Sequence, residues 1–234
     1  MFLLYEGKAK QVYNTDLPDE VIIYFKDDAT AFNGEKKDNI PGKGLINMAF
    51  SRFFFELLHK NGIKTHVLSF IDDLSFRVKK VSIIPVELVI RNYAAGSICK
   101  RLGFNKGEKF AYPLCEFFLK DDSLGDPLLT EAHIQLMNLI SEEEVSRIKE
   151  YALKINTVLS EFMDSKDITL VDFKLEFGKT SEGEIILADE ISPDTCRFWK
   201  KGTMDSLDKD VYREDKGSLV DSYSQLADIV GIKL

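Results

Sequence analysis

Acidic and basic side chains alternate with apolar ones in the segment 170–178, which reads Leu-Val-Asp-Phe-Lys-Leu-Glu-Phe-Gly. Successive side chains of a β-strand point to opposite faces, so Asp172, Lys174 and Glu176 would share one face. Two acids beside a lysine on one face are typical of a site that holds a cation and a charged substrate. A solvated hairpin face without any chemistry is the alternative interpretation.

A second acidic pair, Asp189 and Glu190, follows the next predicted strand. A two-residue turn at 182–183 would place Glu176 opposite Asp189, with Cβ atoms about 5 Å apart. Two carboxylates at that distance repel each other unless a cation lies between them, and Mg²⁺ is commonly held by one or two carboxylates plus phosphates. A three-residue turn at 181–183 would shift the register by one residue and remove the pairing, so both registers stay open here.

Basic residues near glycine could contact phosphates at the start of the chain. The segment 5–13 predicts two strands joined around Gly7, with Lys8 and Lys10 beside the turn. Glycine permits close backbone approach and lysine binds phosphate, although many exposed hairpins carry such residues by chance.

The common phosphate loops G-x-x-x-x-G-K-[ST] and G-x-G-x-x-G do not occur in the sequence. The Gly-Lys-Gly run at 42–44 leads into a predicted helix and could bind an anion or simply join two elements.

Two arginines are candidates for binding a substrate phosphate. The apolar run 83–90 predicts a buried strand that ends at Arg91, and a turn of small residues then reaches Ser97. An arginine can donate two parallel hydrogen bonds to a phosphate, and a serine adds a hydroxyl group. A salt-bridged surface arginine is the alternative. Arg197 follows the second acidic pair closely, so it lies near those carboxylates in sequence.

The composition limits the classes of function. A chain of 234 residues with 44% hydrophobic residues can form one large domain or two lobes with a substantial core. A net charge of −8 argues against long nucleic acids as partners. Cys99, Cys115 and Cys196 lack metal-ligand spacing and suit a reducing cytosol. Since no basic region precedes a long apolar run, and no apolar stretch reaches about 18 residues, we expect neither a signal peptide nor a membrane span.

Short β-type runs dominate residues 1–90, and three segments have helical periodicity. The first predicted helix spans about 45–58, the second begins at a capping box formed by Ser141 and Glu144, and the third runs from about 218 to 231. The predicted strands are 2–5, 12–13, 21–25, 67–70, 75–81, 86–90 and 184–188.

This order of elements predicts an α+β fold with two lobes and a ligand in the crevice between them. The stretches 27–44 and 200–217 combine charge with glycine, and we expect them to be the most mobile. The aromatic residues at 53–55 give the first helix more apolar surface than one face can bury, which could favour a contact with a second copy of the chain.

With these residues in view, the chain resembles the SAICAR synthetases, the phosphoribosylaminoimidazole-succinocarboxamide synthases of purine biosynthesis. The resemblance spans the whole chain. It depends most on the run at 83–97, with its apolar-Pro-apolar-Glu start, its arginine and its closing Gly-Ser, and on the D-x-K-x-E-F-G run that begins at Asp172. The Gly-Lys-Ala-Lys run at 7–10 and the stretch 189–194 also fit the family.

The resemblance implies an enzyme that uses ATP to join L-aspartate to carboxyaminoimidazole ribonucleotide (CAIR) through an acyl phosphate. It implies a kinase-like, antiparallel β-rich lobe at 1–84 over a larger α+β lobe at 85–234, with ATP in the cleft. ATP and Mg²⁺ would be the cofactors, the partners would be small-molecule substrates, and the protein would be a homodimer. The cytoplasmic location that we expect follows from the cysteines.

The resemblance also implies roles for individual residues. ATP would be bound by Gly7, Lys8, Lys10, Val12, Val86 and Glu87, together with Glu176 and Asp189, which would hold Mg²⁺. The acidic substrates would be bound by Arg91, Ser97, Asp172, Lys174, Asp194, Arg197, Lys209 and Arg213, with Asp172 and Lys174 acting at the reacting groups. One departure from some relatives is the Ala-Phe-Asn-Gly run at 31–34, where others carry a Gly-Asp pair, and this leaves the role of that loop open.

Two rival functions are compatible with parts of the pattern. A small-molecule kinase would use the same phosphate-covering hairpin, but its release of ADP would not depend on aspartate. A nucleotide-binding sensor without turnover would have little need for clustered acids.

Overall fold

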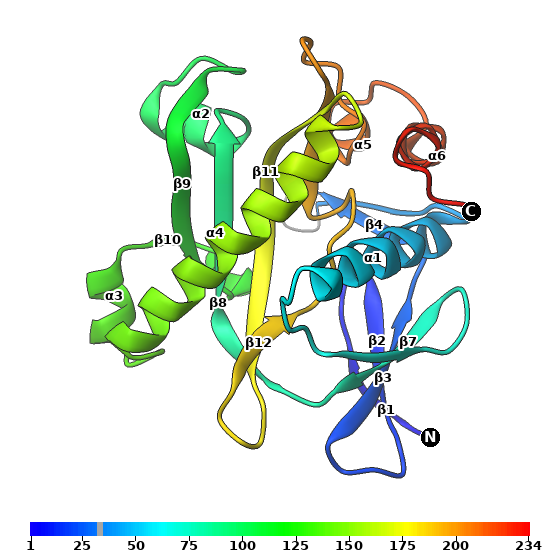
Figure 1. Ribbon diagram of the computed structural model, residues 1–234, viewed down its shortest axis with the longest axis vertical. Coiled ribbons are helices and arrows are strands. Elements are labelled where there is room, and N and C mark those ends of the chain that lie inside the picture. The colour runs from blue at the N-terminus through cyan, green and yellow to red at the C-terminus, as the bar shows by residue number, and fades with distance from the viewer. Residues whose placement is uncertain (32–34) are drawn as a thin grey trace.

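The protein combines antiparallel β-sheets with helices packed around them, in a computed structural model that describes residues 1–31 and 35–234 (Figure 1). The α+β class predicted from the sequence is therefore confirmed. Of the 31–34 run, only Ala31 lies within the described residues. Within the same described ranges, no helix has both the length and the apolar character needed to cross a membrane.

A five-stranded sheet forms much of the N-terminal part, in the order β1-β2-β3-β7-β6. Its strands are β1 (Leu3–Glu6), β2 (Lys10–Asn14), β3 (Glu20–Phe25), β6 (Val67–Phe70) and β7 (Ser75–Lys79). Alternate residues of β3 are buried, as expected for a strand with one face on the core. The predicted first helix is confirmed as α1 (Lys43–Lys60), which packs against β3.

Two short strands occupy part of the stretch 27–44. They are β4 (Asp28–Ala31) and β5 (Lys36–Asn39), which pair only with each other. The stretch 200–217 contains the short helix α5 (Asp210–Arg213). Both stretches thus contain regular structure, and their mobility stays a prediction.

A second sheet carries the acidic segment, in the order β10-β9-β8-β11-β12. Its strands are β8 (Ser82–Tyr93), β9 (Lys109–Leu119), β10 (Leu128–Leu129), β11 (Ile168–Lys179), β12 (Ile185–Ala188) and β13 (Cys196–Lys200). One edge of β11 pairs with β8, while the other pairs first with β13 and then with β12. β11 is therefore the central strand of this sheet and pairs with three others.

Helices cover the second sheet and the junction between the sheets (Figure 1). α4 (Glu142–Asp164) packs across β11 and β8, and its predicted capping box of Ser141 and Glu144 is confirmed. α6 (Leu219–Val230) confirms the third predicted helix and packs against α1. The shorter helices lack a strong periodic pattern in the sequence and were not predicted. They are α2 (Ser97–Leu102), η2 (Asp122–Leu124), α3 (Glu131–Leu136) and α5.

The turn between β11 and β12 corrects the predicted two-residue hairpin. Glu176 pairs with Ala188, not with Asp189. The backbone N–H of Thr180 donates to the Glu184 carbonyl at 2.9 Å, which leaves the three residues 181–183 in the turn. Gly183 has φ +80°, a conformation that glycine adopts without the steric cost that a Cβ imposes. The three-residue alternative is therefore the observed one.

One continuous apolar core joins the two sheets. It includes residues of β3 and α1 as well as residues of β8, β11 and α4. Phe54 and Phe55 are fully buried in this core, and Phe53 packs against it. The expectation that these aromatic residues offer surface to a second copy is therefore wrong, because the core of the same chain already covers them.

Candidate active site

A cleft of about 850 Å³ lies between the five-stranded sheet and the strands β8 and β11. Most residues singled out in the sequence line it, and they come from both sheets. These are Gly7, Lys8, Lys10, Val12, Glu87, Arg91, Asp172, Lys174, Glu176, Asp189, Asp194, Arg197, Lys209 and Arg213. The fold thus gathers in one cavity residues that are up to about 200 positions apart in sequence.

Two of the predicted residues lie outside this lining. Val86 is buried in the apolar core, because neighbouring side chains of a strand alternate and Glu87 takes the face toward the cleft. Ser97 is exposed and reaches the site through Arg91, whose Nη2 donates to the serine Oγ at 3.2 Å.

One part of the cleft is apolar. Val12, Val21, Ile23, Val78 and Ile83 line it, and four of them belong to the five-stranded sheet. Apolar side chains on one wall suit a flat ring such as a nucleobase, since burial of its faces is favourable.

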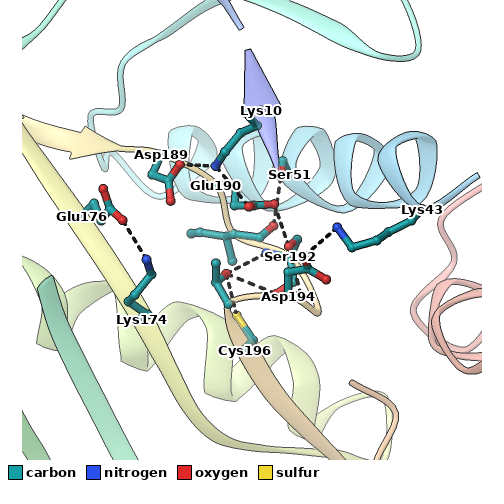
Figure 2. Close-up of polar contacts among 12 residues, drawn as sticks. Lys10, Lys43, Ser51, Lys174, Glu176, Asp189, Glu190, Ser192, Asp194 and Cys196 are labelled. Atoms are coloured by element: carbon teal, nitrogen blue, oxygen red, sulfur yellow. Dashed lines mark hydrogen bonds and ion pairs between the residues drawn. The ribbon is translucent and has the colours of Figure 1, made fainter. Parts of the chain in front are cut away.

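Lys10 reaches across from β2 to two carboxylates that follow β12 (Figure 2). Its Nζ donates to Asp189 and, at 3.0 Å, to Glu190. Burial disfavours the charged amine, but the two carboxylates outweigh this effect and raise the pKa of Lys10. Asp189 has φ +62°, so its backbone departs from the extended strand just where its side chain turns to the lysine. Lys8 diverges from Lys10 and pairs with Asp122 at 2.6 Å.

A second cluster of alternating charge surrounds Glu176 on β11. One oxygen of this buried carboxylate accepts hydrogen bonds from Lys174 at 2.7 Å and from Lys120 at 2.9 Å. Lys174 also donates to Glu87 at 2.8 Å. Burial alone would raise the pKa of Glu176, but the two lysines outweigh it and hold that pKa well below its usual range. Burial raises the pKa of Glu87.

The arginines form a continuous chain of ion pairs with buried acids. Arg91 lies between two carboxylates, with its Nε 2.7 Å from Glu116 and its Nη1 2.7 Å from Asp172. Asp172 in turn accepts from Arg197 at 3.0 Å, and Arg197 pairs with Asp210 at 2.8 Å. The interpretation of Arg91 as a surface arginine is therefore wrong, because its side chain is 4% exposed.

The turn after β8 contacts the guanidinium groups of both arginines. Gly96 has φ +63°, and a Cβ there would lie only 2.7 Å from Nη2 of Arg197. Arg91 Nη2 meets Ser97 one residue further on. We call Arg91, Gly96, Ser97 and Arg197 the anion cradle, since two guanidinium groups and a hydroxyl converge where only a glycine leaves room.

Asp194 links the loop after β12 to three other elements. Its carboxylate pairs with Lys43 of α1 at 2.7 Å and with Lys209 at 3.4 Å, and it accepts from Tyr223 of α6 at 2.7 Å. Figure 2 shows Lys43 pointing to this carboxylate. Burial would raise the pKa of Asp194, but Lys209 and Lys43 lower it. Burial lowers the pKa of Lys209 and outweighs the opposing effect of Asp194.

Nearly the whole chain matches a known protein family. The family model for SAICAR synthetase matches residues 3–229. The chain belongs to the SAICAR synthetase family. The phosphoribosylaminoimidazole-succinocarboxamide synthase of Caldanaerobacter subterraneus subsp. tengcongensis is 57% identical over 96% of this chain and 95% of its own length. That of Coprothermobacter proteolyticus is 53% identical over 98% of this chain and 97% of its own length.

Solved structures of SAICAR synthetases have the same fold. The synthase of Ehrlichia chaffeensis superimposes with a TM-score of 0.96 at 44% identity, with both chains covered completely. A SAICAR synthetase solved in complex with ADP gives a TM-score of 0.94 at 46% identity, covering 98% of this chain and 97% of the other. The expected enzyme class, an ATP-dependent carbon–nitrogen ligase of purine biosynthesis, is thereby confirmed.

Several charged residues of the site in this SAICAR synthetase family member were not predicted from the sequence. Lys120 follows β9, which was not predicted, and Glu116 lies within that strand. Lys43 stands in the Gly-Lys-Gly run, but the structure pairs it with Asp194 instead of leaving the run as an anion site. A lysine between two glycines at a predicted helix start was the only local signal, and it did not identify the partner.

The carboxylates fit the cation that the family implies. Among the described residues, no cluster of three or more acidic, histidine or cysteine side chains is arranged to hold a metal. Glu176 and Asp189 nevertheless line the same cleft, and carboxylate oxygens are the ligands Mg²⁺ prefers. One or two carboxylates suffice when a nucleotide supplies phosphate oxygens as further ligands.

Proposed function

We propose that the described cleft binds ATP at the end covered by the β1–β2 hairpin and binds the two acidic substrates at the end that contains the anion cradle, Lys209 and Arg213. The carboxylate of CAIR attacks the γ-phosphorus of ATP, which yields an acyl phosphate and ADP. The amine of L-aspartate then attacks the acyl carbon and loses a proton, and inorganic phosphate departs. Activation is needed because the oxygen of a free carboxylate is a poor leaving group.

The arrangement of charge in the cleft carries this proposal. Lys10, Lys120 and Lys174 lie beside Glu176 and Asp189 in the same cavity that contains the anion cradle. ATP, a phosphorylated nucleotide and a dicarboxylic acid would bring a large negative charge into this one cleft. Fixed cations offset that charge, and phosphoryl transfer depends mainly on positioning and charge neutralisation.

On the ATP side, we assign Gly7, Lys8 and Lys10 to the phosphates. Gly7 lies in the turn between β1 and β2. Its backbone N–H donates to the Lys10 carbonyl at 2.8 Å, which closes this turn. Lys8 would exchange its exposed partner Asp122 for a phosphate at little cost, because exposed ion pairs contribute about 0–1 kcal/mol. Val12 and the other apolar lining residues would contact the base.

Glu176 and Asp189 would hold Mg²⁺, which would offset charge on the phosphates. Lys174 would then be free to leave Glu176 for a substrate oxygen while it keeps its contact with Glu87. We assign Lys174 to the reacting groups on this basis.

On the substrate side, we assign the anion cradle to the ribonucleotide phosphate. Asp172 orients both arginines of the cradle, since it accepts from Arg91 and from Arg197. We call Lys209 and Arg213 the aspartate subsite, because these cations line the cleft beyond the cradle and suit a dicarboxylic acid. Asp194 would hold Lys209 in place.

Three further features stay proposals. We place the boundary between the two lobes at residues 84 and 85, close to the start of β8 at Ser82. A cytoplasmic location is supported by the three cysteines, which form no disulfide with one another. A homodimer is supported by the family resemblance, and analytical ultracentrifugation of the purified chain tests it.

The deciding experiment measures ADP release with ATP and Mg²⁺, while CAIR and L-aspartate are added singly, together or not at all. We expect full release only with both substrates, accompanied by a succinocarboxamide product. Release with CAIR alone at the full rate would indicate a kinase. Bound ATP that survives with every substrate present would indicate a sensor and remove the ligase assignment.

A further inference from the structure

We propose that Asp210 is a positioning residue shared by the two subsites for acidic substrates, the anion cradle and the aspartate subsite. The inference rests on the proposed function, which assigns Arg197 to the ribonucleotide phosphate and Arg213 to L-aspartate. The role differs from a contact with substrate, because Asp210 would act through the two arginines.

The two oxygens of the Asp210 carboxylate serve different arginines. Oδ2 accepts from Nε of Arg197 at 2.8 Å, and Oδ1 accepts from Nη1 of Arg213 at 2.6 Å. The residue is 5% exposed. Burial would raise its pKa, but Arg197 and Arg213 outweigh this and lower the pKa of Asp210 to about 2. The carboxylate is therefore charged at neutral pH and bridges the two cations.

Asp208 fixes this bridge to the sheet. Its Oδ1 accepts from the backbone N–H of Asp210 at 2.8 Å, and its Oδ2 accepts from the backbone N–H of Phe198 at 2.8 Å. Phe198 is the neighbour of Arg197 on β13, so a single fully buried side chain ties the strand to the start of α5. The backbone positions of Arg197 and Asp210 are thus set relative to each other.

The bridge has a consequence for binding. Arg197, Lys209 and Arg213 line one cleft, and without an acid between them their like charges would push the side chains apart. Long cationic side chains also lose rotamer freedom when they bind, and an anchored guanidinium has already lost part of it. Because one carboxylate anchors both arginines, its loss should weaken the binding of both acidic substrates. ATP, assigned to the Lys10 end of the cleft, should be unaffected.

The test compares Asp210→Asn with wild type in steady-state assays of ADP release. We expect KM to rise for CAIR and for L-aspartate, each by about tenfold or more, as for the loss of a charge-assisted hydrogen bond. KM for ATP should stay within about twofold. Asp228→Asn, on an exposed position of α6, is the matched control and should leave all three constants unchanged. A rise for only one acidic substrate, or for neither, overturns the shared role, and an equal rise for ATP indicates general damage and overturns it too.

Two further measurements keep the proposal testable if Asp210→Asn does not fold. Asp210→Glu keeps the charge with a longer side chain, and we expect it to recover part of the affinity for both acidic substrates. Circular dichroism shows whether each variant is folded. If Asp210→Asn does not fold, Asp210→Glu is compared with wild type directly, and a rise in KM for only one acidic substrate, or for neither, overturns the shared bridge.

The outcomes separate this inference from the proposed function. A wild-type protein that forms no succinocarboxamide removes the proposed function, whatever the Asp210 variants do. A wild-type ligase whose Asp210→Asn variant changes a single KM keeps the function and removes only the bridge.

Discussion

Glu176 shows at the scale of one residue how the site keeps a carboxylate charged while it is buried. It is 5% exposed, and burial acts to protonate it. Lys174 and Lys120 outweigh that effect at 2.7 and 2.9 Å. A charged carboxylate is the form that can bind a divalent cation, so its two lysine partners preserve the chemistry that the proposed function requires.

The substitution Glu176→Gln should abolish most Mg²⁺-dependent turnover and leave the fold intact. Glutamine has nearly the same shape but removes the charge, and the loss of one preorganised electrostatic contact typically lowers kcat by about 10²–10³-fold. ADP release at increasing Mg²⁺ and circular dichroism measure the two effects. Glu182→Gln, on the exposed turn after β11, is the control. Near-normal turnover at saturating Mg²⁺ would take Glu176 out of the metal site.

Asp208 should make the stability of the protein depend on pH. Burial, followed by the negative charge of Asp210, raises the pKa of Asp208 from 3.8 to about 7. Between these values the folded state binds the proton more tightly than the unfolded chain, so this contribution to stability is lost as the pH rises from about 4 to about 7. Asp208→Asn should remove that slope. Denaturant unfolding of both proteins at several pH values measures it, and parallel pH profiles would show that Asp208 does not titrate in this range.

At the scale of elements, the turn between β8 and α2 decides whether the cradle can form. Arg91 on β8 and Arg197 on β13 both donate to Asp172, and the guanidinium group of Arg197 has room beside the turn because Gly96 has no side chain. The conformation of Gly96, with φ +63° and ψ −130°, is one that residues with a Cβ rarely adopt. A single glycine in a short connection thus decides whether side chains of two strands fit side by side.

Gly96→Ala should raise KM for CAIR while leaving KM for ATP nearly unchanged. The added Cβ would lie 2.7 Å from Nη2 of Arg197 and displace it. Gly103→Ala is the matched control, because Gly103 also has positive φ but no atom within 4 Å of the added Cβ. Both variants should lose about 1 kcal/mol or more of stability from backbone strain. Equal KM values for CAIR in the two variants would show that the cradle does not bind this substrate.

At the scale of the whole molecule, the two sheets beside the cleft share one apolar core. The apolar core is continuous through both, and the backbone N–H of His66 donates to the Leu187 carbonyl across the junction at 2.8 Å. α1 packs against β3 and also against α4 and α6. Since the proposed boundary at residue 84 cuts through this shared core, neither part should be stable by itself.

Equilibrium unfolding in denaturant should therefore show a single transition. Trp199 is the only tryptophan of the chain, and it is buried on β13 of the second sheet, so its fluorescence reports on that part alone. Far-UV circular dichroism reports on all elements. We expect the two curves to coincide, as in two-state unfolding. A circular dichroism transition that begins before the fluorescence change would indicate that the N-terminal sheet unfolds independently.

The sequence by itself determined the features that depend on neighbouring residues. The alternation at 170–178 was sufficient to predict β11 and to place Asp172, Lys174 and Glu176 toward one cleft. The capping box at Ser141 predicted the start of α4, because a cap depends on residues three positions apart. The same local runs were specific enough to identify the family.

Only the tertiary structure decided which distant residues meet. The turn at 181–183 set the register of β12, yet Asp189 still reached the cleft, because its backbone turns aside and Lys10 binds it. One lysine that pairs with Glu176 and one that pairs with Asp194 lie on elements far from them in sequence, so no local pattern identifies these partners. Asp210 bridges two arginines only because the fold places β13 next to α5. Periodicity fixes the face on which a side chain lies, whereas the neighbour on that face depends on strand pairing and packing over the whole chain.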